Sequence, residues 1–276
     1  MTQSMPRSST PSLPAQGHQT SRTRVERVDL DDSATIAQMV ALAEAVRRTD
    51  APFEHEPTLT GYAGWLRHGW DGEAPEAYVL REAGALVGVL HLHLGEWDNQ
   101  HLAWAGVAIH PAHRRRGLGR TLWRAAEDLA RERGRTSIGT DGWESPGVER
   151  FAADCGLRRG SVSVARRQQV DTLDRSWLAE VHAEAAARAR HYELLRLRAP
   201  TPEELLPAVA ELTAANNDAP TDDLEIEDEV FPVERIRAYE SAQTARRHRL
   251  YRVVARHRET GELVGHSVVA VEQERP

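Results

Sequence analysis

The sequence of 276 residues lacks lysine altogether, so all 35 of its basic residues are arginine. Its single cysteine, Cys155, excludes a disulfide within the chain and fits a reducing compartment. No apolar run reaches the roughly 18 residues that a transmembrane helix needs. Residues 1–22 also lack the apolar core of a secretory signal peptide. We therefore expect a cytoplasmic protein that begins with a disordered tail over residues 1–22.

The charge balance argues against nucleic acids and anionic membranes as binding partners. The formal net charge is −7, so the chain as a whole does not attract polyanions or anionic membranes. Hydrophobic residues make up 40% of the chain and charged residues 28%, which is typical of globular proteins. The length accommodates two domains of ordinary size. We expect a folded protein that binds neither nucleic acid nor membrane.

Hydrophobic periodicity predicts alternating strands and helices over the first part of the chain. The expected strands are 23–30, two strands within 76–97 that join at Glu82–Gly84, 102–111, 136–143 and 161–171. The expected helices are 31–50, a stretch around 58–70, 119–135 and 145–156. A helical connector is expected over 174–190.

The pattern then begins again. A strand is expected at 191–200, followed by a helix over 201–217 with Thr201 as its cap and Pro202 as its first residue. The segments "REAGALVG" (81–88) and "RETGELVG" (258–265) are identical at six of eight positions, and each lies within a pair of expected strands. We interpret this as a repeat of one domain, with domains expected at 23–173 and 191–276.

One stretch, "HPAHRRRGLGR" at 110–120, carries the strongest chemical signal. It contains four arginines and two glycines between an apolar strand and a helix that starts near Thr121. This order directs free backbone N–H groups and the positive helix end at one place, where an anion binds well. It is neither a P-loop nor a complete dinucleotide fingerprint. The acidic chain and the lack of interleaved aromatics argue against nucleic acid, while a plain solvated basic loop stays open.

The longer segment "VAIHPAHRRRGLGRTLWRAAEDLARERG" resembles the acetyl-CoA motif of the GCN5-related N-acetyltransferases (GNAT): a strand, then R-x-x-G-x-G at 114–119, then a helix. The resemblance covers 23 to about 171 as one domain and 191–276 as the first half of another. It implies an α/β protein with a mixed sheet, in a tandem GNAT arrangement. A second arginine–glycine stretch would fall beyond Pro276, so we expect the chain to be a fragment.

The resemblance also implies a reaction. Acetyl-CoA would be the cosubstrate, and its acetyl group would pass directly to a primary amine of a small molecule or peptide. The strand at 136–142 should splay from the strand at 102–109, and a backbone N–H near Ile109 would polarise the thioester carbonyl. The residues expected to bind the cofactor are Val107, Ala108, Ile109, Arg114, Arg115, Arg116, Gly117, Leu118, Gly119, Arg120 and Thr121.

The catalytic groups are harder to identify from the sequence. The place of the family's tyrosine acid falls on Ala152, and that of its early glutamate on Ala103 and Trp104. The candidates to move protons are therefore other titratable residues, namely Glu54, His91, His93 and Asp141. His91 and His93 share one face of a strand, but no third ligand has metal-site spacing, so no metal is expected.

Two alternatives remain open. The first domain could bind acetyl-CoA without catalysis, as a sensory or structural unit. Trp65, Trp104 and Trp143 could line an acceptor pocket or lie in the core. An incomplete second sheet would tend to pair with another chain, which makes a homodimer an arrangement to test.

Overall fold

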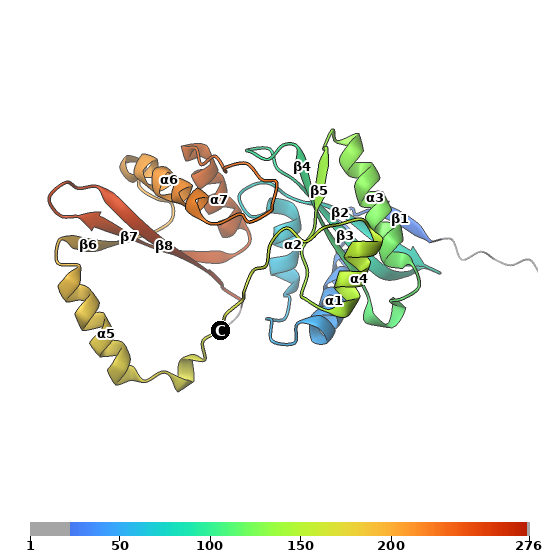
Figure 1. Cartoon of the computed structure of the whole chain (residues 1–276), viewed down its shortest axis with the longest axis horizontal. Coiled ribbons are helices and arrows are strands. Elements are labelled where there is room, and N and C mark those ends of the chain that lie inside the picture. Colours follow the sequence, from blue (N-terminus) through green and yellow to red (C-terminus); the bar gives the residue numbers. More distant parts are fainter. Residues whose placement is uncertain (1–22, 275–276) are drawn as a thin grey trace, which may run out of the picture.

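The structure, a computed structural model, describes residues 23–274, so the tail predicted at 1–22 lies outside the described residues. Two β-sheets lie side by side along the long axis of the molecule, each with its own helices (Figure 1). The first half contains β1 (Arg24–Arg27), α1 (Ser33–Asp50), α2 (Leu59–His68), β2 (Glu76–Glu82), β3 (Ala85–Leu94), β4 (Leu102–Ile109), a 3₁₀ turn η1 (Pro111–His113), α3 (Leu118–Glu132), β5 (Ser137–Gly139) and α4 (Pro146–Asp154).

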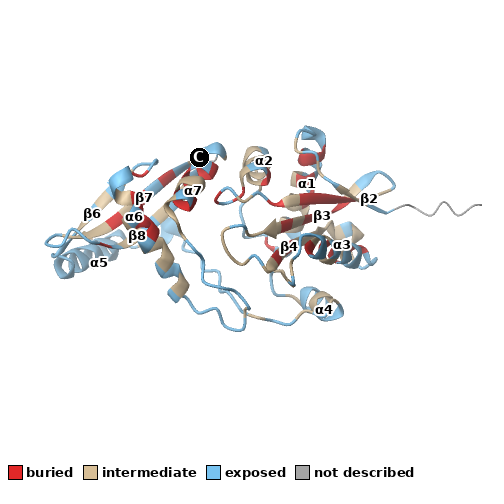
Figure 2. Cartoon of the chain, turned by 90° about the horizontal axis from the view of Figure 1, so that it is seen from above, coloured by how far each residue is buried: buried red, intermediate tan, exposed pale blue. Residues whose placement is uncertain are grey.

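The first sheet has the order β1-β2-β3-β4-β5. Its first four strands are antiparallel neighbours, whereas β5 pairs with β4 in parallel, so the predicted mixed sheet is confirmed. Alternation along β3 sends Val89 towards α1 and α2 and sends Leu90 and Leu92 towards α3. The sheet is therefore buried between helices on both faces, and Figure 2 shows buried residues along β2 and β3.

The second half contains a three-stranded antiparallel sheet in the order β6-β7-β8. Its elements are α5 (Arg175–Arg188), β6 (Tyr192–Leu197), η3 (Glu203–Leu205), α6 (Leu206–Ala214), η4 (Ala215–Asp218), α7 (Val233–Ala245), β7 (His248–His257) and β8 (Leu263–Glu272). The helices α6 and α7 pack on one face of this sheet around a small core. The connector helix α5 is exposed along its length (Figure 2). The domain boundaries drawn from the sequence stay predictions.

Two of the expected elements are wrong. No strand forms at 161–171, where Val162 and Val164 are exposed and only a 3₁₀ turn, η2 (Val170–Thr172), follows. An alternating segment needs a partner edge of several residues, and β5 offers only 3. The helix expected from Thr201 begins later, because the Thr201 hydroxyl donates to the buried carboxylate of Glu240 at 2.5 Å instead of capping a helix.

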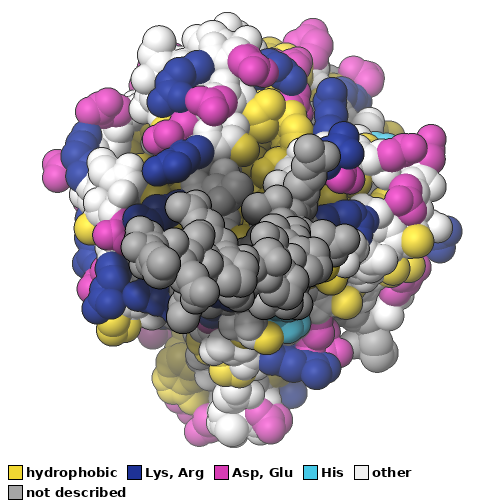
Figure 3. Space-filling model, turned by 90° about the vertical axis from the view of Figure 1, so that its right-hand side faces the viewer, with side chains coloured by type: hydrophobic (Ala, Val, Ile, Leu, Met, Phe, Trp, Pro, Cys, Tyr) yellow, Lys and Arg dark blue, Asp and Glu magenta, His cyan; other side chains and the backbone are white. Residues whose placement is uncertain are grey.

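The surface charges and the helix composition agree with the sequence, which has no long apolar run. Acidic and basic side chains are interspersed on the visible parts of the face in Figure 3, at the end of the molecule formed by the first half. Between residues 23 and 274, no helix has the length and apolar character needed to cross a bilayer.

A buried charge network joins the two halves. Arg235 on α7 donates to Asp71 at 2.7 Å and to Asp98 at 2.5 Å, and both aspartates belong to loops of the first half. All three side chains are only 10% exposed. Buried charges remain in place only when they are paired, so this network fixes α7 against the loops that follow α2 and β3.

Replacing Arg235 with glutamine should therefore destabilise the chain strongly. The variant leaves two buried carboxylates without their cation, and we expect the free energy of unfolding to fall by about 3–5 kcal/mol in urea denaturation. Arg188→Gln removes an exposed pair with Glu184 on α5 and should change stability by less than about 0.5 kcal/mol. Equal effects of the two substitutions would contradict the structural role of Arg235.

Candidate active site

The strands β4 and β5 diverge after a short stretch of pairing. Residues 102–104 pair with 137–139, and β4 then continues to Ile109, where no strand within residues 23–274 pairs with that side. The amide of His110 donates to the Val87 carbonyl of β3. Because amide directions alternate along a strand, the amides and carbonyls of Val107 and Ile109 point away from β3. They face the space that β5 has left, and this open edge can pair with an extended molecule.

The side chain of Trp104 packs against β5 at the last paired residues of the two strands. A Cβ atom on Gly139 would lie 2.5 Å from Cζ3 of the Trp104 ring, so only glycine allows the indole to sit against β5. The indole N–H donates to Asp141 at 2.8 Å, which fixes the ring over the divergence point. The splay expected from the sequence is present, and Trp104 lies where it begins.

The arginine–glycine loop follows β4 directly and ends at α3. Arg115 and Gly117 adopt left-handed backbone conformations, with φ of 63° and 83°. Gly117 precedes α3 and supplies no side-chain cap. The amide of Thr121 donates to the Gly117 carbonyl, so the amides of residues 118–120 precede the first backbone bond of the helix. The start of α3 thus presents unpaired donors next to the open edge of β4.

The four arginines of this loop differ in their surroundings. Arg114 donates through both terminal nitrogens to Asp50 at 2.7 Å and through Nε to the Ile109 carbonyl at 3.1 Å. Arg116 donates to Glu82 at 2.8 Å. Within residues 23–274, the side chains of Arg115 and Arg120 are exposed and make no hydrogen bond or ion pair. Two arginines therefore support the loop, and two are available to an anion.

The two candidate histidines lie beneath α2 on the other side of the splay. The Tyr62 hydroxyl lies 2.9 Å from Nε2 of His91, and the Trp65 ring centroid lies 4.7 Å from that of His91 and 5.5 Å from that of His93. Burial lowers the pKa of His91 to about 3, so this ring is neutral near pH 7 and is a weak base. Burial also raises the pKa of the Tyr62 hydroxyl, which stays protonated and can donate.

His93 has a different electrostatic setting. It lies across from Trp104 in the sheet register, at the divergence point. Burial lowers its pKa, but the negative charge of Asp141 opposes this effect. The structure thus brings His93 and Asp141 to the same place. Glu54 instead lies exposed in the loop after α1, where its backbone amide donates to the Ala51 carbonyl and its carbonyl accepts from Arg47.

Other contacts at the site could not be found from sequence spacing. The rings of Phe53 and Trp143 meet edge to face at 4.8 Å, and both are largely exposed. They join the loop after α1 to the loop after β5. The guanidinium of Arg167 lies 5.7 Å from the Phe53 centroid. Trp143 is thus a surface residue beside the splay and not a core residue.

The single cysteine of the chain has a structural role. Cys155 packs against the α3 side of the core, and burial raises the pKa of its thiol, which disfavours the reactive thiolate. Among residues 23–274, no group of three or more His, Cys, Asp or Glu side chains is arranged to hold a metal ion.

Comparisons with known proteins find similarity to acetyltransferases. Residues 40–156 match the sequence model of the acetyltransferase (GNAT) family. The mycothiol acetyltransferase of Geodermatophilus obscurus is 30% identical over 152 residues, which are 54% of this chain and 46% of that protein. That of Thermomonospora curvata is 32% identical over 160 residues, which are 57% of this chain and 48% of that protein. The chain thus spans about half the length of these curated relatives.

A solved structure is similar over most of the chain. It is described as a tandem GNAT protein from the clavulanic acid biosynthesis pathway, without acetyl-CoA. It has 25% sequence identity and a TM-score of 0.68, and the match covers 91% of this chain and 75% of that one. The fold expected from the arginine–glycine motif is therefore confirmed, and the tandem arrangement agrees with that of this neighbour.

The neutral His91 predicts a pH dependence of stability. The unfolded chain protonates this histidine below about pH 6.5, and the folded chain only near pH 3, so stability falls as the pH drops between these values. Between pH 7 and pH 5, His91 should account for a loss of about 2 kcal/mol in the free energy of unfolding. The His91→Gln variant should lose that part of the pH dependence in urea denaturation, while His182→Gln, on exposed α5, should keep it. An unchanged dependence in His91→Gln would contradict the buried neutral ring.

Proposed function

We propose that the chain transfers the acetyl group of acetyl-CoA to a primary amine of a small molecule or peptide, because residues 40–156 match the sequence model of the GNAT acetyltransferase family. One observation carries this proposal. The open edge of β4 lies next to the unpaired amides at the start of α3, where a Cβ on Gly119 would lie 3.9 Å from Cγ1 of Ile109, so one extended anionic molecule can engage both.

Acetyl-CoA would then bind along two elements. Its pantetheine amides pair with Val107 and Ile109 in the manner of an added strand. Its pyrophosphate sits on the amides of residues 115–120, at the positive end of α3. The free side chains of Arg115 and Arg120 add charge-assisted bonds to the phosphate oxygens. These assignments place the thioester at the divergence point beside Trp104.

The chemistry at that point requires a free amine. The nitrogen attacks the thioester carbonyl, a C–N bond forms, and the C–S bond breaks to release the CoA thiolate, which takes up a proton. An outward-pointing amide of β4 stabilises the developing oxyanion. His93 is the group we assign to remove the ammonium proton, because it lies at the divergence point and faces the charge of Asp141.

A second candidate function is acetyl-CoA binding without catalysis. The observation that favours it is the alanine at 152, where the family places a tyrosine acid. A transfer assay separates the two functions, since a binding domain would hold acetyl-CoA and release no CoA thiol in the presence of amines. A cytoplasmic location and a homodimer stay predictions from the sequence.

Gly117 provides a direct test of the proposed phosphate site. A glutamate there places a carboxylate beside the α3 amides, and we expect calorimetric affinity for acetyl-CoA to fall at least 100-fold. The matched control is Gly134→Glu at the other end of α3. Gly134 has φ of 72°, and in both positions a Cβ meets no atom within 4 Å. The backbone strain is therefore similar, and only the charge at the proposed site differs. Loss of binding in both variants, or in neither, would contradict the site.

Substitutions around Arg114 test whether this residue positions the loop or binds the phosphates of acetyl-CoA itself. Its three hydrogen bonds to Asp50 and Ile109 hold the loop to the end of α1, so Asp50→Asn should weaken acetyl-CoA binding about tenfold. Arg114→Lys keeps the charge but loses the two-pronged contact, and it should weaken binding by a similar factor. Asp128→Asn, which removes an exposed pair on α3, is the control.

The opposite result is equally informative. If Arg114 instead serves the phosphates, Asp50→Asn frees its guanidinium and tightens acetyl-CoA binding, and Arg114→Lys changes it little. Calorimetric titration of the three variants and the unmodified chain with acetyl-CoA shows whether the affinity falls or rises, and so distinguishes the two roles of Arg114.

A further inference from the structure

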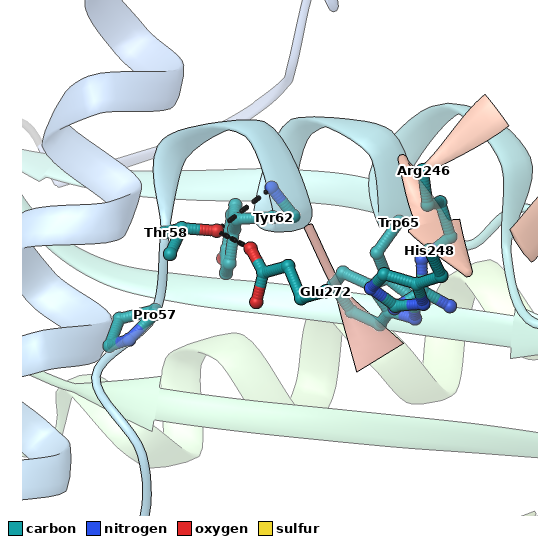
Figure 4. Close-up of a pocket in the computed structure, with 8 residues that line it drawn as sticks. Pro57, Thr58, Tyr62, Trp65, Arg246, His248 and Glu272 are labelled. Atoms are coloured by element: carbon teal, nitrogen blue, oxygen red, sulfur yellow. Dashed lines mark hydrogen bonds between the residues drawn. The ribbon is translucent and has the colours of Figure 1, made fainter. Parts of the chain in front are cut away.

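A cavity of about 440 Å³ lies where the second half meets α2. Its first-half wall is formed by Thr58, Tyr62 and Trp65, and its second-half wall by residues of β7, β8 and the turn before β7 (Figure 4). The cavity is lined by Pro57, Thr58, Gly61, Tyr62, Trp65, Arg246, His248 and Glu272. Its size suits a small ligand such as an amino acid or a short peptide.

Two glycines of α2 allow the second half to come this close. A Cβ on Gly61 would lie 2.8 Å from a carboxylate oxygen of Glu272, and one on Gly64 would lie 3.1 Å from the Cα of Arg246. The hydroxyl of Thr58, which caps α2, also donates to Glu272. The cavity is therefore formed by specific contacts between α2 and the second half.

Arg246 is the unusual residue of this cavity. It donates to the Gly69 carbonyl at 3.1 Å, but its Nε is buried without a hydrogen-bond partner. It makes no ion pair within residues 23–274, whereas the buried guanidinium of Arg252 lies 3.3 Å from a Glu240 oxygen. Burial lowers the pKa of Arg246, and the charge of Glu272 opposes this effect without forming an ion pair with the guanidinium. Such a group gains free energy when an anion binds to it.

The other charge in the cavity limits which anion fits. Glu272 lies on the same wall, so a doubly charged phosphate would be repelled and would find only one cation. A carboxylate carries a single charge and matches the planar fork of a guanidinium. The cavity thus favours a carboxylate over a phosphate.

The cavity also borders the proposed transfer site. Tyr62 and Trp65 line it, and the same two rings contact His91, while Trp65 contacts His93. A ligand whose carboxylate is held at Arg246 therefore lies against the aromatic wall that leads to His93. This aromatic wall therefore connects Arg246 of the second half to the proposed acetyl-transfer site of the first half.

We propose that this cavity binds the carboxylate of the amine acceptor, with Arg246 as the residue that determines this specificity. The inference rests on the proposed function and narrows its substrate class to amino acids or short peptides with a free carboxyl group. It also gives the second half a role in the reaction, since that half supplies the binding cation.

Calorimetry with a matched pair of probes tests this proposal. Glycylglycine and its C-terminal amide are titrated into the full chain saturated with CoA, which is inert to transfer. We expect the acid to bind at least tenfold more tightly than the amide. Arg246→Gln should abolish the difference, Arg246→Lys should retain part of it, and Arg249→Gln, on an exposed residue of β7, should leave it unchanged.

The outcomes separate this proposal from the proposed function. Equal binding of acid and amide, binding of neither, or a preference that survives Arg246→Gln would overturn the carboxylate site, while CoA binding in the same experiment would leave the acetyltransferase proposal standing. Failure of CoA to bind would instead remove the proposed function on which the cavity's role depends. Retained CoA affinity in Arg246→Gln shows that the variant is folded.

Discussion

The end of the pairing between β4 and β5 is the constraint on which the site depends. The last paired residues are Trp104 and Gly139, where the indole lies against the glycine, and beyond them the backbone of β4 is open as far as Ile109. The same divergence brings the arginine–glycine loop beside an unpaired strand edge. A strand edge and a helix N-terminus are each common features, but their direct succession makes one continuous site for an extended anionic molecule.

The helix α2 connects this site to the rest of the chain. Its Tyr62 and Trp65 side chains face the sheet and enclose His91, while Gly61 and Gly64 face the second half and allow close approach. The Arg235 network lies near the same junction and holds α7 in place with two carboxylates. The position of the second half is thus determined by buried charges, and its side chains reach the wall of the site.

The sequence predicts local features well and long-range contacts poorly. The strong periodicity of α3 and the turn between β2 and β3 depend on neighbouring residues, and both form as expected. By contrast, the pairing of Arg114 with Asp50 joins residues 64 positions apart, and no spacing rule indicates it. The strand expected at 161–171 and the cap expected at Thr201 fail for the same reason. Whether they form depends on a distant strand edge and on the distant carboxylate of Glu240.

The most direct measurement is amide hydrogen exchange of the full chain with and without acetyl-CoA. The account predicts added protection at Val107, Ile109 and residues 115–120, because their amides would bond to the pantetheine and the pyrophosphate, and no change at the start of α6 or α7. Protection confined to other segments, or unchanged exchange along β4 and the loop at saturating acetyl-CoA, would contradict the central claim that the open edge and the helix start form one binding site.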